Sequence, residues 1–117
     1  MKTRIPPMEI KERREYSRAK VEWPVNISGS QGLIQGIIKN MSLGGAYLHV
    51  EELPDMDKNL DLSIEIPEHQ YAVFATGEAI RFEVNASEET PVYYGLGIRL
   101  KEIPEDDFEF LSRTVLR

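Results

Sequence analysis

Residues 33–50 read LIQGIIKNMSLGGAYLHV, and this stretch decides the fold. Its apolar ends, Leu33 to Lys39 and Ala46 to Val50, predict two β-strands. Between them lies the polar turn Asn40-Met41-Ser42-Leu43-Gly44-Gly45, whose paired glycines permit positive φ and the close approach of another molecule. Two interpretations of the turn stay open. It cradles a ligand, or Asn40 and Ser42 only close it on its own backbone, which is what such residues usually do.

Period-two alternation extends to both sides of this stretch. It is clearest from Leu60 to Ile66, where every second residue is apolar. Pro24 predicts an edge strand or an unpaired position, and Gly77 predicts a bulge in a long strand. Strands are therefore expected at residues 21–27, 33–39, 46–50, 60–66, 71–84 and 92–100.

The end of the chain changes to helical spacing. Pro104 suits a first helical turn, and the acids at 105–107 complement the positive end of a helix dipole, so they are interpreted as helix-start charges and not as a metal cluster. Phe108, Leu111 and Val115 then recur at helical intervals. Six strands without helices between them and one closing helix predict a small antiparallel barrel or sandwich.

Charge divides the chain into two parts. Residues 1–20 hold seven cations and three anions (net +4), whereas the other 97 residues hold seven and seventeen (net −10), which gives −6 for all 117 residues. The length suits one domain, so we expect a flexible basic arm over residues 1–20 and a barrel with its helix over 21–117. Within the arm, Ile5-Pro6-Pro7 resists helix and central strand, so the first seven residues are expected to be loose.

The location of the protein follows from what the sequence lacks. The charged N-terminus has no apolar stretch after it, no run is long enough to cross a bilayer, and there are no cysteines. A cytoplasmic protein without membrane insertion is expected.

The basic arm holds two arginines four residues apart, Arg14 and Arg18, with Arg13 directly before them. A guanidinium fork binds phosphate bidentately and also matches the O6 and N7 edge of guanine, which lysine does not reproduce. The alternative is a solvated basic arm that pairs with its own three glutamates, and for an isolated arginine pair that is the commoner case.

Together, the two patterns resemble the signature of the PilZ domain, a bacterial family that binds cyclic di-GMP. That signature is Arg-x-x-x-Arg in an N-terminal arm, followed after the second strand by Asp/Asn-x-Ser-x-x-Gly. The matching residues are Arg14, Arg18, Asn40, Ser42 and Gly45.

The resemblance covers residues 11–117 and implies a six-stranded antiparallel barrel with a C-terminal helix. It also implies that Arg14 and Arg18 hold phosphate and guanine, while Asn40 and Ser42 bind the opposite guanine edge. Asn40 offers one acceptor oxygen where a carboxylate would offer two, so a weaker contact is expected.

Further residues extend the implied site. Gly45, with Gly44 as a weaker candidate, would leave room for a base to approach. In similar proteins an arginine at the position of Arg13 accompanies binding of two stacked dinucleotides instead of one. Arg81 is a further weak candidate, although Arg81 and Arg99 fit outward barrel charges better.

The resemblance implies a receptor without cofactor or metal. Ligand would order the arm against the acidic barrel and expose a surface for a protein effector in motility, pilus or exopolysaccharide control. A chain with one such domain is expected to be an adaptor. The alternative is a PilZ-like interaction module that does not bind the dinucleotide.

Two other function classes are disfavoured. Neither His49 nor His69 has a second ligand or nucleophile at diagnostic spacing, so an enzyme is not expected and both are interpreted as surface or edge residues. A nucleic-acid polymer is not expected as a partner, because the body is acidic. Moreover, most of its aromatic residues fall on expected inner faces; those considered are Trp23, Phe74, Phe82, Tyr93 and Tyr94.

Overall fold

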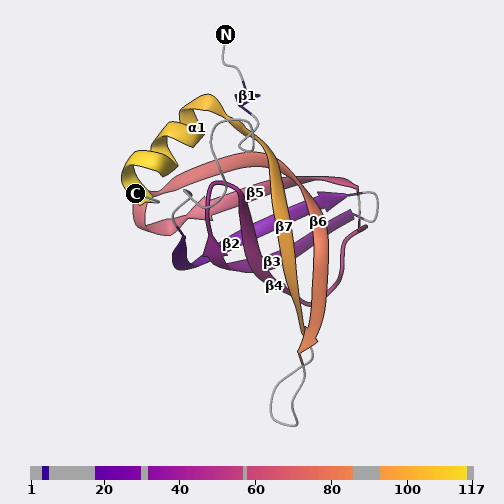
Figure 1. Cartoon of the computed structure of the whole chain (residues 1–117). Coiled ribbons are helices and arrows are strands. Elements are labelled where there is room, and N and C mark those ends of the chain that lie inside the picture. Colours follow the sequence, from indigo (N-terminus) through magenta and orange to yellow (C-terminus); the bar gives the residue numbers. More distant parts are fainter. Residues whose placement is uncertain (1–3, 6–17, 30–31, 57, 86–92, 116–117) are drawn as a thin grey trace.

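The apolar runs form β-strands in the computed structural model, which describes residues 4–5, 18–29, 32–56, 58–85 and 93–115 (Figure 1). The six predicted strands are present, most of them longer than expected at one or both ends. The strands are β1 (Arg4–Ile5), β2 (Ala19–Gly29), β3 (Gly32–Met41), β4 (Gly45–Val50), β5 (Asn59–Ile66), β6 (Tyr71–Asn85) and β7 (Tyr93–Pro104).

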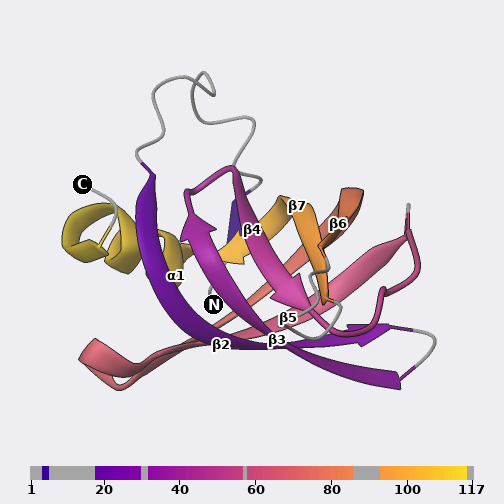
Figure 2. The ribbon, with the colours of Figure 1, turned by 90° about the horizontal axis from the view of Figure 1, so that it is seen from below.

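Strands β2 to β7 close into an antiparallel barrel. Sheet neighbours follow the order β7-β4-β3-β2-β5-β6, and β6 pairs again with β7 to complete the ring. Figure 2 shows these strands curving around one interior, with the C-terminal helix beside the start of β2. The predicted six-stranded antiparallel barrel is confirmed.

The core is built from the inward face of each strand. In β5 the four apolar residues Leu60, Leu62, Ile64 and Ile66 are each at most 3% exposed, as the alternation predicts. On β7, the side chains of Leu96, Ile98 and Leu100 are likewise buried, at most 2% exposed. Each such side chain contributes roughly 1.5–3 kcal/mol by leaving water, so the barrel interior is the main source of stability.

Two irregularities bend β6 against β7. The register shifts between Thr76 and Gly77, but the extra residue is Lys101 on β7, so this bulge lies opposite Gly77 and not in its strand as predicted. The register shifts again between Ala79 and Arg81, where Ile80 is the extra residue on β6. Pro24 pairs with Ile37 on β3. Pairing of β2 with β5 begins only at Val25, so β2 has a local edge at Pro24, which agrees with the edge alternative.

The expectation that the first seven residues stay loose is wrong for β1. Arg4 and Ile5 pair with Pro104 and Ile103 at the end of β7. The end of β7 is free to pair with β1 because β7 extends beyond both of its neighbours. Pairing with β4 reaches only Arg99, and pairing with β6 reaches only Glu102. Strand β2 also begins at Ala19, two residues inside the predicted arm.

The chain ends in a short helix, α1 (Glu105–Phe110), and a π-helical turn, η4 (Leu111–Val115), with three acids in the first turn of α1 as predicted. Tyr71 anchors α1 to the barrel: its ring stacks on Phe110 at 4.0 Å and its hydroxyl donates to Asp107 at 2.6 Å. This hydrogen bond and burial raise the pKa of Tyr71 to about 12. None of the described helices has the length and apolar character to span a membrane.

Candidate functional site

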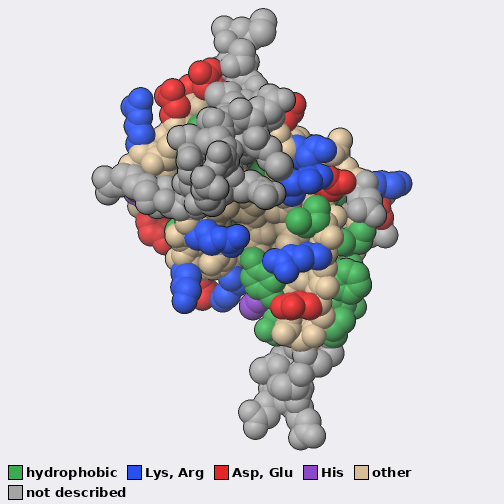
Figure 3. Space-filling model, in the orientation of Figure 1, with side chains coloured by type: hydrophobic (Ala, Val, Ile, Leu, Met, Phe, Trp, Pro, Cys, Tyr) green, Lys and Arg blue, Asp and Glu red, His purple; other side chains and the backbone are tan. Residues whose placement is uncertain are grey.

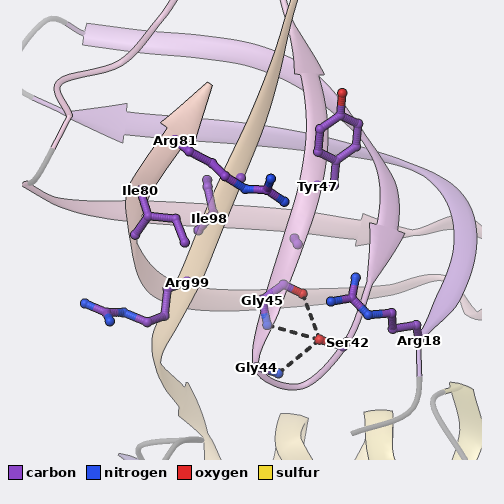
Figure 4. A pocket seen from close by; sticks show the side chains of 11 residues that line it. Arg18, Ser42, Gly44, Gly45, Tyr47, Ile80, Arg81, Ile98 and Arg99 are labelled. Carbon is purple, nitrogen blue, oxygen red and sulfur yellow. Dashed lines mark hydrogen bonds between the residues drawn. The ribbon is translucent and has the colours of Figure 1, made fainter. Parts of the chain in front are cut away.

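Ser42 closes the turn between β3 and β4 on its own backbone. Its amide donates to the Gly45 carbonyl at 2.9 Å, and its Oγ accepts from the amides of Gly44 (3.3 Å) and Gly45 (3.2 Å). The hydroxyl also donates to the Gly45 carbonyl at 3.3 Å (Figure 4). For Ser42, therefore, the structural interpretation of the turn applies: this side chain, 8% exposed, holds the loop shape.

Gly45 is required by the packing of β4 on β7. A Cβ atom at this position would lie 2.7 Å from the carbonyl oxygen of Ile98, so no larger residue fits without moving the strands. The Leu100 amide also donates to the Gly44 carbonyl at 3.1 Å. The space that Gly45 leaves is thus occupied by β7, and the turn is fixed to the barrel at two points.

Asn40 differs from its neighbours in the motif because its side-chain acceptor is unused. It lies on β3 opposite Lys20 and Tyr47, beside shifts in register on both sides. Its Oδ1 is buried, and no residue in the described part of the chain hydrogen-bonds to it. A buried acceptor without a partner costs about 1–3 kcal/mol, so Asn40 is a position that a donor from outside could satisfy.

Three arginines surround the turn. Arg18 precedes β2, Arg81 lies on β6 and Arg99 on β7, and all three line a hollow of about 350 Å³ (Figure 4). Its remaining lining is Ser42, Gly44, Gly45, Ala46, Tyr47, Ile80, Gly97 and Ile98. A second hollow of about 300 Å³ places Asn40 with Arg18, Tyr47 and Arg81, so Arg18 and Arg81 border both.

The three arginines differ in whether a carboxylate pairs with their guanidinium group. Arg99 donates to Glu78 at 2.8 Å, and Lys101 lies 3.8 Å from the same carboxylate. Within the described ranges, no carboxylate pairs with Arg18 or Arg81. These two guanidinium groups are therefore the better positioned to bind an anion.

Two glycines of β7, Gly95 and Gly97, line the second hollow and are covered by side chains from β4 and β6. A Cβ on Gly97 would lie 2.9 Å from Nε of Arg81, so the Arg81 side chain lies across that glycine. A Cβ on Gly95 would overlap the Tyr47 hydroxyl, which donates to Glu83 on β6 at 2.8 Å. Burial and then this bond to Glu83 raise the pKa of Tyr47.

Sequence reasoning missed Tyr47, Gly95 and Gly97. The available signal was the spacing Gly-x-Gly inside a run of strand residues, since glycine in a strand marks the close approach of another group. Arg99 is an exposed outward charge, as expected, and it also lines the first hollow.

The structure brings together most of the predicted site residues. Five of them border the first hollow, and Asn40 borders the second. Arg13 and Arg14 lie outside the described residues. The five are Arg18, Ser42, Gly44, Gly45 and Arg81.

The aromatic and histidine predictions have mixed outcomes. Of the five aromatic residues, most of which were expected on inner faces, Trp23 is buried and Tyr93 and Tyr94 are half-buried. Phe74 and Phe82 are 57% and 48% exposed. His49 is half-buried beside Tyr93, with ring centroids 4.4 Å apart, and burial lowers its pKa. In the described ranges no three His, Cys, Asp or Glu side chains are grouped to hold a metal.

Residues 12–117 match the family model of the PilZ domain. The chain belongs to the PilZ domain family. Among curated protein sequences, none matches this PilZ chain significantly.

Solved structures share the PilZ fold at low sequence identity. The inhibitor of motility MotI/DgrA of Bacillus subtilis is 22% identical, with a TM-score of 0.69 over 86% of this chain and 48% of its own. The PilZ domain of YcgR from Escherichia coli, solved with c-di-GMP, is 14% identical, with a TM-score of 0.62 over 76% of this chain and 78% of its own.

The complex of MrkH from K. pneumonia with c-di-GMP is 17% identical, with a TM-score of 0.70 over 88% of this chain and 51% of that one. The chain thus spans about half the length of MotI and MrkH. At these identities the likeness concerns the fold.

Proposed function

We propose that this PilZ domain is a receptor for cyclic di-GMP that acts as an adaptor. The observation that carries the proposal is the position of Arg18. This residue of the arm motif lines the same hollow as the Ser42–Gly45 turn and, with Arg81, the hollow that contains the unused Asn40 acceptor.

The chemistry of the two hollows fits such a ligand. Cyclic di-GMP carries two phosphates and two guanines, and a guanidinium group binds either of them through paired hydrogen bonds. Arg18 and Arg14 take this role, with Arg81 adding positive charge over Gly97. Arg13 would add a further guanidinium for a second dinucleotide.

Asn40 supplies the complementary contact. Its free Oδ1 accepts one N–H of a guanine edge, whereas a carboxylate there would accept two. Ser42 and Gly45 contribute by fixing the turn, because their polar atoms and space are already used within the barrel.

Ligand binding would act on the arm. The arm carries +4 and the rest of the chain −10, so a dianion held between Arg14, Arg18 and the turn docks a basic segment on an acidic body. Residues 6–17 connect β1 on β7 with β2, so ordering them reshapes the surface beside the turn. A protein effector in motility, pilus or exopolysaccharide control would recognise that surface in the cytoplasm.

Calorimetric titration of cyclic di-GMP into the full chain tests the proposal. Saturable binding is expected for the wild type, and an Arg14→Ala, Arg18→Ala double variant should lose it while circular dichroism shows an intact fold. Arg113→Ala is the matched control, since it removes an exposed guanidinium at the far end of the chain. The stoichiometry of one or two ligands tests the role of Arg13.

A second candidate is a PilZ-like interaction module that does not bind the dinucleotide. It is favoured by the saturated hydrogen bonds of Ser42 and the packing role of Gly45, which explain these two motif residues without a ligand. Absence of any heat of binding in the folded wild type would select it. Under either candidate the domain is a binding module and not an enzyme.

A further inference from the structure

The distal half of β6 has a free backbone edge. Pairing with β5 stops at Glu78, while pairing with β7 continues to Asn85. Residues 79–85 are therefore bonded on one side only among the described strands, and the β6–β7 hairpin projects beyond the barrel (Figure 1). A strand edge of this kind can pair with another chain.

The free edge carries exposed apolar side chains. Ile80, Phe82 and Val84 are 49%, 48% and 60% exposed, and Figure 3 shows hydrophobic side chains gathered along this part of the hairpin. Phe82 and Val84 lie opposite Leu96 and Tyr94 on β7, so they share one face of the hairpin. Exposed apolar groups beside an unpaired edge mark an interaction surface.

Charges on the other face make this edge complementary to itself. Arg81 and Glu83 alternate with Phe82 and Val84 and lie opposite Gly97 and Gly95. In an antiparallel pair of two β6 strands centred on Phe82, Arg81 of each copy faces Glu83 of the other. Phe82 faces its own counterpart, and the two Val84 side chains flank this aromatic pair.

Other registers are disfavoured by the same residues. Moving the pairing by two residues sets Arg81 against Arg81 or Glu83 against Glu83, and a parallel pair does both. Moving it by one residue sets charged against apolar positions. Since like charges directly opposite destabilise a sheet and opposite charges stabilise it, one register is selected.

We propose that the free edge of β6, residues 79–85, binds a second copy of this chain in a two-fold antiparallel pair centred on Phe82. The pairing joins two barrels through a continuous β6–β6 ladder. Because five to seven residues a side make less than a standard interface, the dissociation constant is expected at roughly 10 µM to 1 mM.

This proposal does not depend on cyclic di-GMP binding, but the two share one residue. Arg81 borders both hollows and also provides one charge of each intermolecular pair. Glu83 accepts from Tyr47 through one oxygen, so its other oxygen remains able to meet a guanidinium.

Sedimentation velocity of the full chain over a concentration series up to about 1 mM tests the pairing, a range set by the expected affinity. The wild type should associate to dimers. Glu83→Arg and Arg81→Glu should each weaken self-association at least about tenfold, because both cross-strand pairs become repulsive. An equimolar mixture of these two variants should restore the dimer as a heterodimer.

The double variant Arg81→Glu, Glu83→Arg should pair with itself and not with the wild type, which keeps the test decisive if one single variant fails to fold. Phe74→Ser is the matched control, since Phe74 is equally exposed but lies where β5 covers the edge of β6. A monomeric wild type at the highest concentration would overturn the proposal. A dimer that Glu83→Arg leaves intact would also overturn it. So would binding of an unrelated β-strand peptide at the free edge of β6 by a protein that does not dimerise.

Discussion

The Ser42–Gly45 turn and the Asn40 position belong to one sequence motif but differ in their hydrogen bonding. In the turn, every contact that Ser42 makes is internal, and Gly45 is filled by the Ile98 carbonyl. At Asn40 a buried carbonyl oxygen has no partner among the described residues. Internal contacts thus account for Ser42 and Gly45, whereas the Asn40 oxygen has no described partner and is the acceptor that we propose for the ligand.

The largest effect is expected at Gly45. Gly45→Val should lower the free energy of unfolding by about 3 kcal/mol, because the added side chain meets the Ile98 backbone at 2.7 Å or less. Urea unfolding followed by circular dichroism measures this. If the variant were as stable as the wild type but bound no ligand, Gly45 would provide space for the ligand. The contrast between the Ser42–Gly45 turn and Asn40 would then be wrong.

Ser42 and Asn40 should respond in opposite ways to truncation. Ser42→Ala removes the acceptor of two turn amides and should cost about 1–2 kcal/mol of stability. Asn40→Ala removes a buried acceptor that has no partner among the described residues, so it should raise stability by up to about 1 kcal/mol.

The Ser42→Ala and Asn40→Ala variants should also differ in their affinity for cyclic di-GMP. Asn40→Ala should weaken cyclic di-GMP binding at least about tenfold, or about 1.4 kcal/mol. Calorimetric titration beside urea unfolding of both variants gives the two readouts. Equal losses of stability and affinity in both variants would remove the distinction between them.

Asn40→Asp sharpens the comparison from the other side. A carboxylate accepts two guanine N–H groups where the amide accepts one, so affinity should rise by about three- to tenfold. Titration at neutral pH measures it, and an unchanged affinity would mean that the Asn40 oxygen does not face a guanine edge.

The smallest effect is expected at Tyr47. Tyr47→Phe removes the bond to Glu83 and should cost about 0.5–1 kcal/mol. Because the fold raises the pKa of Tyr47 above its usual 10.0, the protonated form is stabilised. This contribution is fully present below pH 10.0 and is lost as the pH rises through the raised pKa. Unfolding curves of wild type and variant should therefore converge at high pH, and a constant difference would contradict this assignment.

The fold was predictable because apolar residues at every second position of a strand indicate which side chains face the interior. Leu60 to Ile66 and the apolar residues Leu96, Ile98 and Leu100 of β7 are buried as the sequence indicates, whereas the bulge of β6 lies at Ile80 and not at Gly77. Short-range patterns failed where the outcome depends on strand lengths. Phe82 is exposed because β6 extends beyond its pairing with β5. Strand β1 can pair with β7 because β7 extends beyond its pairing with β4 and β6.

The candidate site was predictable in its motif residues but not in its surroundings. Arg18, Ser42 and Gly45 are recognisable by spacing along the chain. Tyr47, Arg99 and the glycines of β7 join them only through pairing of β4, β6 and β7, which no local pattern encodes. The difference between Ser42 and Asn40 depends on individual hydrogen bonds, which the spacing of residues along the chain does not encode.

A crystal structure of the protein with cyclic di-GMP tests the central claim most directly. We expect a guanine N–H about 3 Å from Oδ1 of Asn40, Arg18 on a phosphate or guanine, and Ser42 still bonded to the amides of Gly44 and Gly45. A ligand bound by Ser42 with Asn40 facing away, or a ligand bound outside these two hollows, would contradict the account.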